Sequence, residues 1–292
     1  MWDLMLAELI SVIVTTYNRE DALDAALRAL GRQADRNFEI VVADDGSRAD
    51  TARVVADWAA RLAVPVKHVW HRHDGFRGGE IRNRGIGASS GKLCIFLDGD
   101  CLARPDFVAA HRRLAEPGWF VTGNRILLSR GLTDAVLAEG LAPEAWSLAE
   151  LGRQSLSGSV NRLLPALRLR LGALRKLSSG SWRGAQTCNL AVTRSDLDRI
   201  DGFDGSYTGW GLEDSDLVVR LLHAGVRRKD GRFATGVLHL WHAANDRSGF
   251  AANRARLDTV IRGDRIRAVR GLSSLADEAD APTIGNRARC DG

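Results

Sequence analysis

The sequence predicts an α/β protein whose central sheet is mostly parallel and flanked by helices. Short apolar, β-branched runs recur through the first half of the chain, and each is followed by polar residues and then by a segment with helical spacing. This alternation of strand and helix is typical of a parallel sheet with right-handed crossovers. A chain of 292 residues is long enough for one large α/β domain or two small ones.

The first half supplies four strands with helices between them. We expect strands at 9–16, 38–43, 64–69 and 93–97, and helices over 20–31, over 51–62 and from 78 onward. Leu23, Leu27 and Leu30 share one face of the first helix, and Gly31 ends it. The apolar run before Asp98 is too short for an independent helix and is typical of a strand buried on both faces.

The second half is less regular. We expect helices over 105–114, 196–201 and 213–225, strands at 120–123, 186–192 and 237–242, a basic helical segment over 253–270 and a flexible tail over 276–292. This pattern suggests a first half over 1–124, a helical insertion over 125–180, a second half of the same domain over 181–275, and the tail.

Segment 160–177 combines apolar and basic residues. Its apolar residues recur at helical spacing: Val160, Leu163, Leu164, Leu167, Leu171 and Leu174. One interpretation is a basic amphipathic helix that lies on an anionic membrane surface. The other is an insertion helix that packs its leucines on the core and keeps its arginines at the rim.

Composition limits the partners. The 41 Lys and Arg exceed the 36 Asp and Glu by a net charge of +5, which is compatible with phosphorylated substrates or anionic lipid, and no nucleic-acid-binding motif is present. The four cysteines lack C-x-x-C spacing, which favours a reduced, cytosolic protein. No basic region precedes the first apolar run and no long apolar stretch occurs, so we expect neither a secretory signal nor a membrane span.

Asp98 and Asp100 end the fourth predicted strand. On an extended strand they share a face, and two neighbouring carboxylates repel each other unless a cation lies between them. Carboxylate oxygens suit Mg²⁺ or Mn²⁺, with waters and phosphates as further ligands. The alternative is an ordinary surface turn at Gly99.

Polar residues also follow the other strands, at 15–18, 44–47 and 74–84. Ligands of parallel sheets bind beyond the carboxyl ends of the strands. The chain has no G-x-G-x-x-G after its first strand and no G-x-x-x-x-G-K-[ST], so a phosphate-bearing ligand must be held another way. A metal ion is the simplest means.

Four motifs occur in order along the first half: Val14-Thr15-Thr16-Tyr17-Asn18, Asp44-Asp45-Gly46-Ser47, Arg82-Asn83-Arg84-Gly85 and Asp98-Gly99-Asp100. Together they resemble the nucleotide-sugar-binding half of the family 2 glycosyltransferases, of GT-A fold with a Rossmann-like sheet. The resemblance covers about Ile10 to Asp106 and implies a nucleotide diphosphate sugar, most often a UDP-sugar. The residues expected to bind this donor are Thr15, Tyr17, Asn18, Asp44, Asp45, Arg77, Arg82, Asp98 and Gly99.

The chemistry of these residues fits a donor of this kind. An aspartate at 44 or 45 can accept a hydrogen bond from a pyrimidine N3–H, and a buried group that loses its partner costs about 1 to 3 kcal/mol, which gives base selectivity. The alternative is that it caps the following helix. Arginines pair with diphosphate oxygens, and we favour Arg82 over Arg84 because the two face different sides of a helix.

Gly209-Trp210-Gly211-Leu212-Glu213-Asp214 precedes a predicted helix. It closely resembles the Gly-Trp-Gly-x-Glu-Asp motif of galactosyl- and N-acetylhexosaminyl-transferases, which implies acceptor binding by Trp210, Gly211 and Glu213 and catalysis by Glu213 and Asp214, with Asp214 as general base. The helix dipole is expected to keep Asp214 ionised. The alternative is that acidic residues simply favour a helix start.

His239 and His242 lie in the last strand-like run. In the enzymes that this sequence resembles, a histidine downstream of the acidic motif completes the metal site, so Asp100, His239 and His242 are the expected metal ligands. Positions 239 and 242 face opposite sides of an extended strand, so one ion would contact only one of them. We prefer His239, and an ordinary core histidine is the alternative.

Together these features predict a metal-dependent, inverting glycosyltransferase. It would move a hexose or N-acetylhexosamine from a nucleotide diphosphate sugar to a hydroxyl of a glycan, glycolipid or small molecule, with Mn²⁺ or Mg²⁺ as cofactor. A retaining enzyme and a non-catalytic, membrane-associated nucleotide-sugar-binding module are the alternatives. The expected location is the cytoplasm, alternatively at a membrane surface contacted through 160–177.

Overall fold

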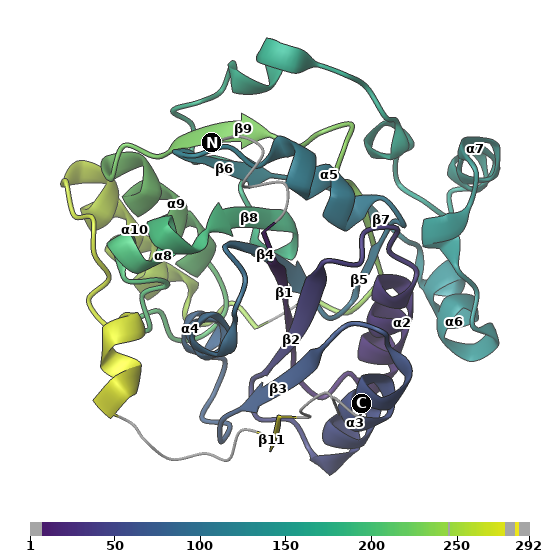
Figure 1. The fold of residues 1–292 in the computed structure, drawn as a ribbon, viewed down its shortest axis with the longest axis horizontal. Helices are drawn as coiled ribbons and strands as arrows, with labels where there is room; N and C mark the ends of the chain where they lie inside the picture. The colour runs from purple at the N-terminus through teal and green to yellow at the C-terminus, as the bar shows by residue number, and fades with distance from the viewer. Residues whose placement is uncertain (1–7, 245, 278–283, 286–292) are drawn as a thin grey trace, which may run out of the picture.

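A sheet of eight strands lies at the centre of the described residues, which are 8–244, 246–277 and 284–285 of this computed structural model (Figure 1). The strand order is β11-β3-β2-β1-β4-β8-β6-β9. The strands are β1 (Ile10–Thr16), β2 (Phe38–Asp44), β3 (Val66–Trp70), β4 (Leu93–Asp98), β6 (Trp119–Thr122), β8 (Leu190–Thr193), β9 (Arg227–Asp230) and β11 (Ile284–Gly285). Strands β1 to β4 are parallel, and β8 runs antiparallel to β4.

Helices cover both faces of this sheet (Figure 1). One face carries α2 (Glu20–Gly31), α3 (Ala49–Arg61) and α5 (Phe107–Leu114), and the other carries α4 (Gly78–Ala88), α8 (Arg194–Ile200) and α9 (Glu213–His223). Successive strand residues point to opposite faces, so Val12 packs with the α2 leucines whereas Ile13 belongs to the core that contains Leu217 of α9. The predicted α/β class is confirmed.

A second, small sheet places functional residues beside the first. Its order is β5 (Cys101–Ala103), β10 (Val237–His239) and β7 (Arg125–Leu127). His239 pairs with Cys101, directly after the acidic turn, and Val237 pairs with Arg125. This pairing carries His239 from the second half of the sequence to Asp100 in the first.

The remaining elements surround these sheets. They are α6 (Arg130–Glu139), α7 (Leu148–Leu156), α10 (Phe250–Arg262) and the 3₁₀ turns η1 (Pro143–Ala145), η2 (Leu164–Ala166), η3 (Gly172–Lys176), η4 (Thr187–Asn189) and η5 (Leu272–Asp277). The strands and helices predicted for the first half agree with the structure to within about two residues. In the second half, the strand expected at 186–192 is the turn η4 followed by β8, the run 237–242 is a strand only to His239, and the helix expected over 253–270 ends at Arg262.

Segment 160–177 is not a helix, so the helical form that both interpretations assumed is wrong, whereas the membrane contact itself stays a prediction. Only the 3₁₀ turns η2 and η3 form there. Pro165 has no N–H to donate and blocks a helix around it, and Gly172 has a left-handed φ of +50°. Several leucines of the expected stripe are exposed, including Leu164 and Leu174.

Some expectations stay predictions. The tail at 276–292 and Cys290 lie mostly or wholly outside the described residues. The proposed divisions after 124, 180 and 275 are not tested. Within the described ranges, no helix has both the length and the apolar character needed to cross a membrane.

Candidate active site

A cavity of about 610 Å³ opens at the carboxyl ends of β1 and β4. It is lined by residues that follow β1, β4 and β10 and by the N-terminal turn of α9. Asp100 and Asp214, which the sequence separates by 114 positions, line the same cavity. The acidic turn Asp98-Gly99-Asp100 and the acid pair Glu213 and Asp214 therefore line the same cavity.

Gly99 forms the tight turn between the two aspartates. Its N–H donates to the Thr15 carbonyl at 2.8 Å, and a Cβ on Gly99 would lie only 3.0 Å from that oxygen. On an extended strand Asp98 and Asp100 would share a face. Because the chain turns at Gly99, their side chains have different partners instead. Asp98 accepts a hydrogen bond from Arg82 Nη2 at 3.3 Å, whereas Asp100 faces the histidines.

Asp100 lies between two imidazoles. Its Oδ1 is 3.5 Å from His239 Nε2 and its Oδ2 is 3.6 Å from His242 Nε2. Strand β10 ends at His239, so the chain leaves the extended conformation and brings both rings to one carboxylate. Both rings thus approach Asp100, but the group of potential ligand atoms that lie within 4.8 Å of one another includes His239 and not His242, so the preference for His239 stays a prediction.

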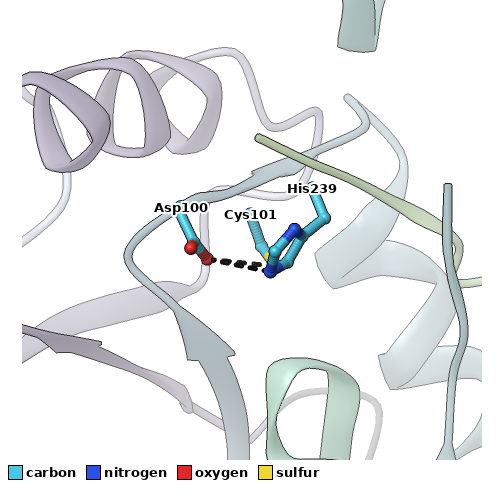
Figure 2. Close-up of side chains that lie close together, drawn as sticks. All are labelled: Asp100, Cys101 and His239. Carbon is cyan, nitrogen blue, oxygen red and sulfur yellow. Dashed lines mark hydrogen bonds and ion pairs between the residues drawn. The ribbon is translucent and has the colours of Figure 1, made fainter. Parts of the chain in front are cut away.

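Figure 2 shows Asp100 and His239 pointing toward each other, with Cys101 beside them. Potential ligand atoms of these three residues lie within 4.8 Å of one another. Burial raises the pKa of the Cys101 thiol well above its usual range, so the carboxylate and the imidazoles are the better donors. Carboxylate oxygens suit Mg²⁺ and Mn²⁺ and imidazole nitrogens suit divalent transition metals, so Asp100 with His239 is a donor set for a divalent metal ion.

The acid pair stands at the start of α9. Gly211, with φ of +106°, turns the chain into this helix and allows the Glu213 side chain to reach Arg82. Glu213 Oε1 accepts a hydrogen bond from Arg82 Nη1 at 3.0 Å, whereas its buried Oε2 has no partner. Glu213 Oε2 is thus an acceptor left for a ligand in the cavity.

Asp214 is not held ionised by the helix dipole as expected. Burial and the adjacent charge of Glu213 raise its pKa to about 7, although Arg82 opposes this rise. The desolvation of the carboxylate and the like charge beside it outweigh the lowering of the pKa by Arg82 and by the hydrogen bond from the Ser215 N–H. A carboxyl group with a pKa near 7 is suited to accept a proton at neutral pH.

Trp210 forms an aromatic wall of the cavity. Its ring stacks near Phe250 of α10, with centroids 6.4 Å apart and planes 24° apart, and the Arg247 guanidinium lies 5.0 Å from it. Asn253 Nδ2 donates to the Gly211 carbonyl at 3.1 Å. Helix α10 thereby fixes the loop that carries the indole.

Asp45 lines the cavity, but Asp44 does not. Asp44 accepts the Ser47 N–H at 2.8 Å and faces His68 Nε2 at 3.1 Å. The N-cap of α3 is Arg48, so neither aspartate caps that helix. Asp45 is the aspartate that a ligand can reach.

A buried histidine holds Asp45. His71 Nε2 lies 2.5 Å from Asp45 Oδ1, and its Nδ1 lies 3.3 Å from Glu80 Oε1. Burial alone would lower the pKa of His71, but its hydrogen bonds to Asp45 and Glu80 raise it, and the bond to His71 lowers the pKa of Glu80 to about 2. No local pattern predicts this contact, because Asp45 lies 26 positions before His71.

The remaining donor-side residues divide into two groups. Thr15, Tyr17 and Arg82 line the cavity, with Tyr17 stacked on His73 at 4.3 Å. Asn18 and Arg77 do not line it. Asn18 Oδ1 accepts the Arg48 N–H at 3.0 Å, and the Arg77 guanidinium is bound to Glu80 at 3.2 Å.

Arg125 is a cavity residue that the sequence analysis missed. Its guanidinium contacts Cys188 Sγ at 3.6 Å, and the structure gives it no carboxylate partner among the described residues. No motif surrounds it, and only the pairing of β7 with β10 brings it to the cavity. The cavity also contains other residues without a sequence signal: Arg19, Phe76, Gln186, Thr187 and Phe250.

Residues 11–156, which are 146 of the 292 residues, match the family model described as glycosyl transferase family 2. The chain belongs to this family. Residues 176–242 also match the model described as N-terminal domain of galactosyltransferase. Both resemblances found in the sequence are confirmed at the level of the family.

Named relatives are themselves glycosyltransferases. The chain is 32% identical over 244 residues to validoxylamine A glucosyltransferase of Streptomyces hygroscopicus subsp. limoneus. The alignment covers 78% of this chain and 51% of that protein. It is 28% identical over 234 residues to chondroitin synthase of Pasteurella multocida, covering 74% of this chain and 23% of the synthase. The chain thus spans about half or less of the length of these relatives.

Solved structures of similar fold confirm the GT-A architecture. A mannosyltransferase from Pyrobaculum calidifontis in complex with GDP-Man and Mn²⁺ has a TM-score of 0.57 at 18% identity, covering 94% of this chain and 66% of that one. TarS 1-349 from S. aureus in complex with UDP-GlcNAc has a TM-score of 0.58 at 15% identity. The match covers 86% of this chain and 66% of that one. At such identities the similarity establishes the fold alone.

Proposed function

We propose that this protein transfers a hexose or N-acetylhexosamine from a nucleotide diphosphate sugar to an acceptor hydroxyl, with inversion at the anomeric carbon. The observation that carries the proposal is a single cavity lined both by Asp100 with its two histidines and by Asp214. A leaving diphosphate and an attacking hydroxyl must meet at one sugar. The cavity supplies the groups that each of them requires.

The donor base is recognised at Asp45. Its carboxylate is fixed by His71 and by the Arg77 N–H at 3.1 Å, so it presents an acceptor that selects a base N–H such as the uracil N3–H. Tyr17 beside it offers a ring face for stacking. A UDP-sugar is therefore the preferred donor, in keeping with the UDP-GlcNAc bound to TarS.

Asp100, His239 and His242 would hold Mn²⁺ or Mg²⁺. When bound, such an ion supplies positive charge that stabilises the diphosphate as it leaves. Arg125 adds a second positive charge on this side of the cavity, since β7 aligns it with Val237, two positions before His239. Arg82 cannot take this role without losing partners, because Asp98 and Glu213 already occupy its guanidinium.

The acceptor binds on the Trp210 side. The indole face packs against a sugar ring, and the unpartnered Glu213 Oε2 accepts a hydrogen bond from a hydroxyl of the acceptor, which orients it. Asp214 Oδ2 removes the proton of the attacking hydroxyl as the new bond forms, while Oδ1 is engaged by the Ser215 N–H at 2.6 Å. Attack opposite the leaving diphosphate inverts the anomeric carbon.

A donor panel tests this proposal. We expect UDP-glucose or UDP-GlcNAc, with Mn²⁺, to raise the melting temperature more than GDP-mannose does, because a ligand at 100 times its Kd stabilises a protein by about 2.7 kcal/mol. NMR of the product made with the donor that binds should show the inverted anomer. No stabilisation by any nucleotide sugar would overturn the proposal, and a retained anomer would overturn its stereochemistry.

A further inference from the structure

Segment 156–177 exposes an unusual number of leucines. Leu156, Leu164, Leu169, Leu174 and Leu177 are 91%, 64%, 45%, 60% and 80% exposed. Single exposed leucines are ordinary on protein surfaces, but five within one segment mark a surface that contacts something else. In Figure 1 this segment is the teal stretch that runs along the outer edge of the molecule from α7 toward β9.

The segment is held firmly in this exposed position. Arg175 is buried, and its Nη1 donates to the carbonyls of Asp230 at 2.8 Å and Arg232 at 2.6 Å, while its Nη2 donates to the Leu169 carbonyl at 2.8 Å. The Leu169 N–H donates to the Phe233 carbonyl at 3.0 Å. A buried guanidinium that binds three carbonyls fixes the backbone at positions 169 and 175, on either side of Leu174.

Ion pairs fasten the segment at two more points. Arg168 Nε lies 2.6 Å from Asp106, and Lys176 Nζ lies 2.7 Å from Glu116. The leucines are therefore presented by an anchored backbone. They could lie on the core only if these contacts broke.

The charge of the segment indicates what it contacts. Residues 156–177 contain no aspartate or glutamate, and their basic residues are Arg162, Arg168, Arg170, Arg175 and Lys176. Arg162 and Arg170 are exposed and have no carboxylate partner among the described residues. Two copies of this surface would repel each other, whereas an anionic surface would attract it.

The segment also borders the cavity. Arg162 Nη2 donates to the carbonyl of Arg125 at 2.8 Å, and Arg125 lines the cavity. Beyond the other end of the segment, residues 184–188 line the cavity as well. A surface docked on this segment would lie next to the cavity wall.

We propose that segment 156–177 docks the protein on an anionic lipid bilayer. The exposed leucines enter the boundary between headgroups and acyl chains, and Arg162 and Arg170 lie against lipid phosphates. This inference does not depend on the proposed sugar transfer. The membrane-binding element that we propose is an anchored loop with exposed leucines and arginines, in place of the amphipathic helix expected from the sequence.

Vesicle sedimentation tests the inference. We expect the protein to bind vesicles of phosphatidylcholine with about 30 mol% phosphatidylglycerol much more tightly than vesicles of phosphatidylcholine alone, and added salt should weaken this binding. The double variant Leu174→Gln/Leu177→Gln should bind at least about tenfold more weakly, because two apolar side chains are lost from the interface. Arg170→Gln should weaken binding about fivefold, and only to the anionic vesicles.

Val269→Gln is the matched control, since Val269 is also highly exposed but lies outside the segment. All variants should keep the UDP affinity of the wild type, because none of these residues lines the cavity. Absence of vesicle binding by the wild type, or equal binding by the double variant, would overturn the inference. Self-association that the double variant abolishes would assign the surface to a second copy instead. Loss of UDP binding in the wild type would overturn only the proposed function.

Discussion

Single residues set the surroundings of each carboxylate in the cavity. Asp45 is fixed by His71, and Asp98 and Glu213 by Arg82, whereas the hydrogen bonds that Asp214 accepts from the described part of the chain come from the Ser215 N–H and hydroxyl. Burial and the like charge of Glu213 raise its pKa to about 7. The proton affinity of Asp214 therefore sets the pH range in which it can act as a base.

We expect kcat to rise with pH through about 7. Below the pKa of Asp214 a proton occupies the carboxylate that must accept one, and above it the base form is present. Glu213→Gln removes the charge that raises this pKa, so the midpoint should move to lower pH. A rate that is flat across about one unit on either side of pH 7, or a midpoint unchanged in the variant, would contradict this assignment.

Arg125 is expected to bind the donor phosphate that carries the sugar, which is the terminal phosphate of UDP once the sugar has left. Arg125→Gln should weaken UDP binding in the presence of Mn²⁺ by about tenfold to a hundredfold, because a hydrogen bond to a charged group is worth about 1.5 to 3 kcal/mol. UMP binding should change little, since UMP lacks that phosphate. Calorimetry with Arg53→Gln as an exposed control checks this, and equal losses for UDP and UMP would exclude the role.

At the scale of elements, the sequence was sufficient to place a strand or helix where one physical signal dominates. Strand β1 and helix α2 have uninterrupted β-branched or helical patterns, and both appear where expected. The helix predicted from the leucine spacing at 160–177 does not form, because Pro165 interrupts it. His242 was expected on the opposite side of the strand from His239, because nothing in the sequence marks the end of β10 at His239.

Contacts between distant elements were beyond sequence reasoning. Motif residues at the ends of β1 and β4 and at the start of α9 line one cavity. Arg125 and the His71 contact to Asp45 depend on strand pairing and loop packing that no local pattern encodes. The residues of the site were thus better predicted than their partners.

The turn between β4 and β5 depends on glycine. In Gly99→Ala the new methyl group would lie 3.0 Å from the Thr15 carbonyl, so the turn must shift. We expect a loss of about 1 to 3 kcal/mol in unfolding free energy and a smaller Mn²⁺-dependent shift in melting temperature with UDP. Gly87→Ala in α4 is the control, because a Cβ there meets nothing within 4 Å; a similar loss in both variants would refute the close-contact explanation.

At the scale of the whole molecule, Arg82 joins the two halves of the sequence. It is buried and binds Asp98 at the end of β4 and Glu213 at the start of α9. The donor side and the acceptor side of the cavity therefore share one cation. Their relative placement depends on it.

Arg82→Met should lower the free energy of unfolding by about 3 to 5 kcal/mol, because it leaves buried acids without a counter-charge. Chemical denaturation measures this loss. The double variant Arg82→Met/Glu213→Gln should be less destabilised than the sum of the single variants, since one of the uncompensated charges is gone. Strict additivity would show that the two side chains do not interact.

The central claim is that Asp214 deprotonates the acceptor in the cavity that holds the donor. The most direct measurement is kcat and UDP affinity of Asp214→Asn beside the wild type. We predict a fall in kcat of about 10²- to 10⁴-fold, the usual contribution of a general base, with UDP affinity in Mn²⁺ unchanged. Turnover within a few fold of the wild type would contradict the claim.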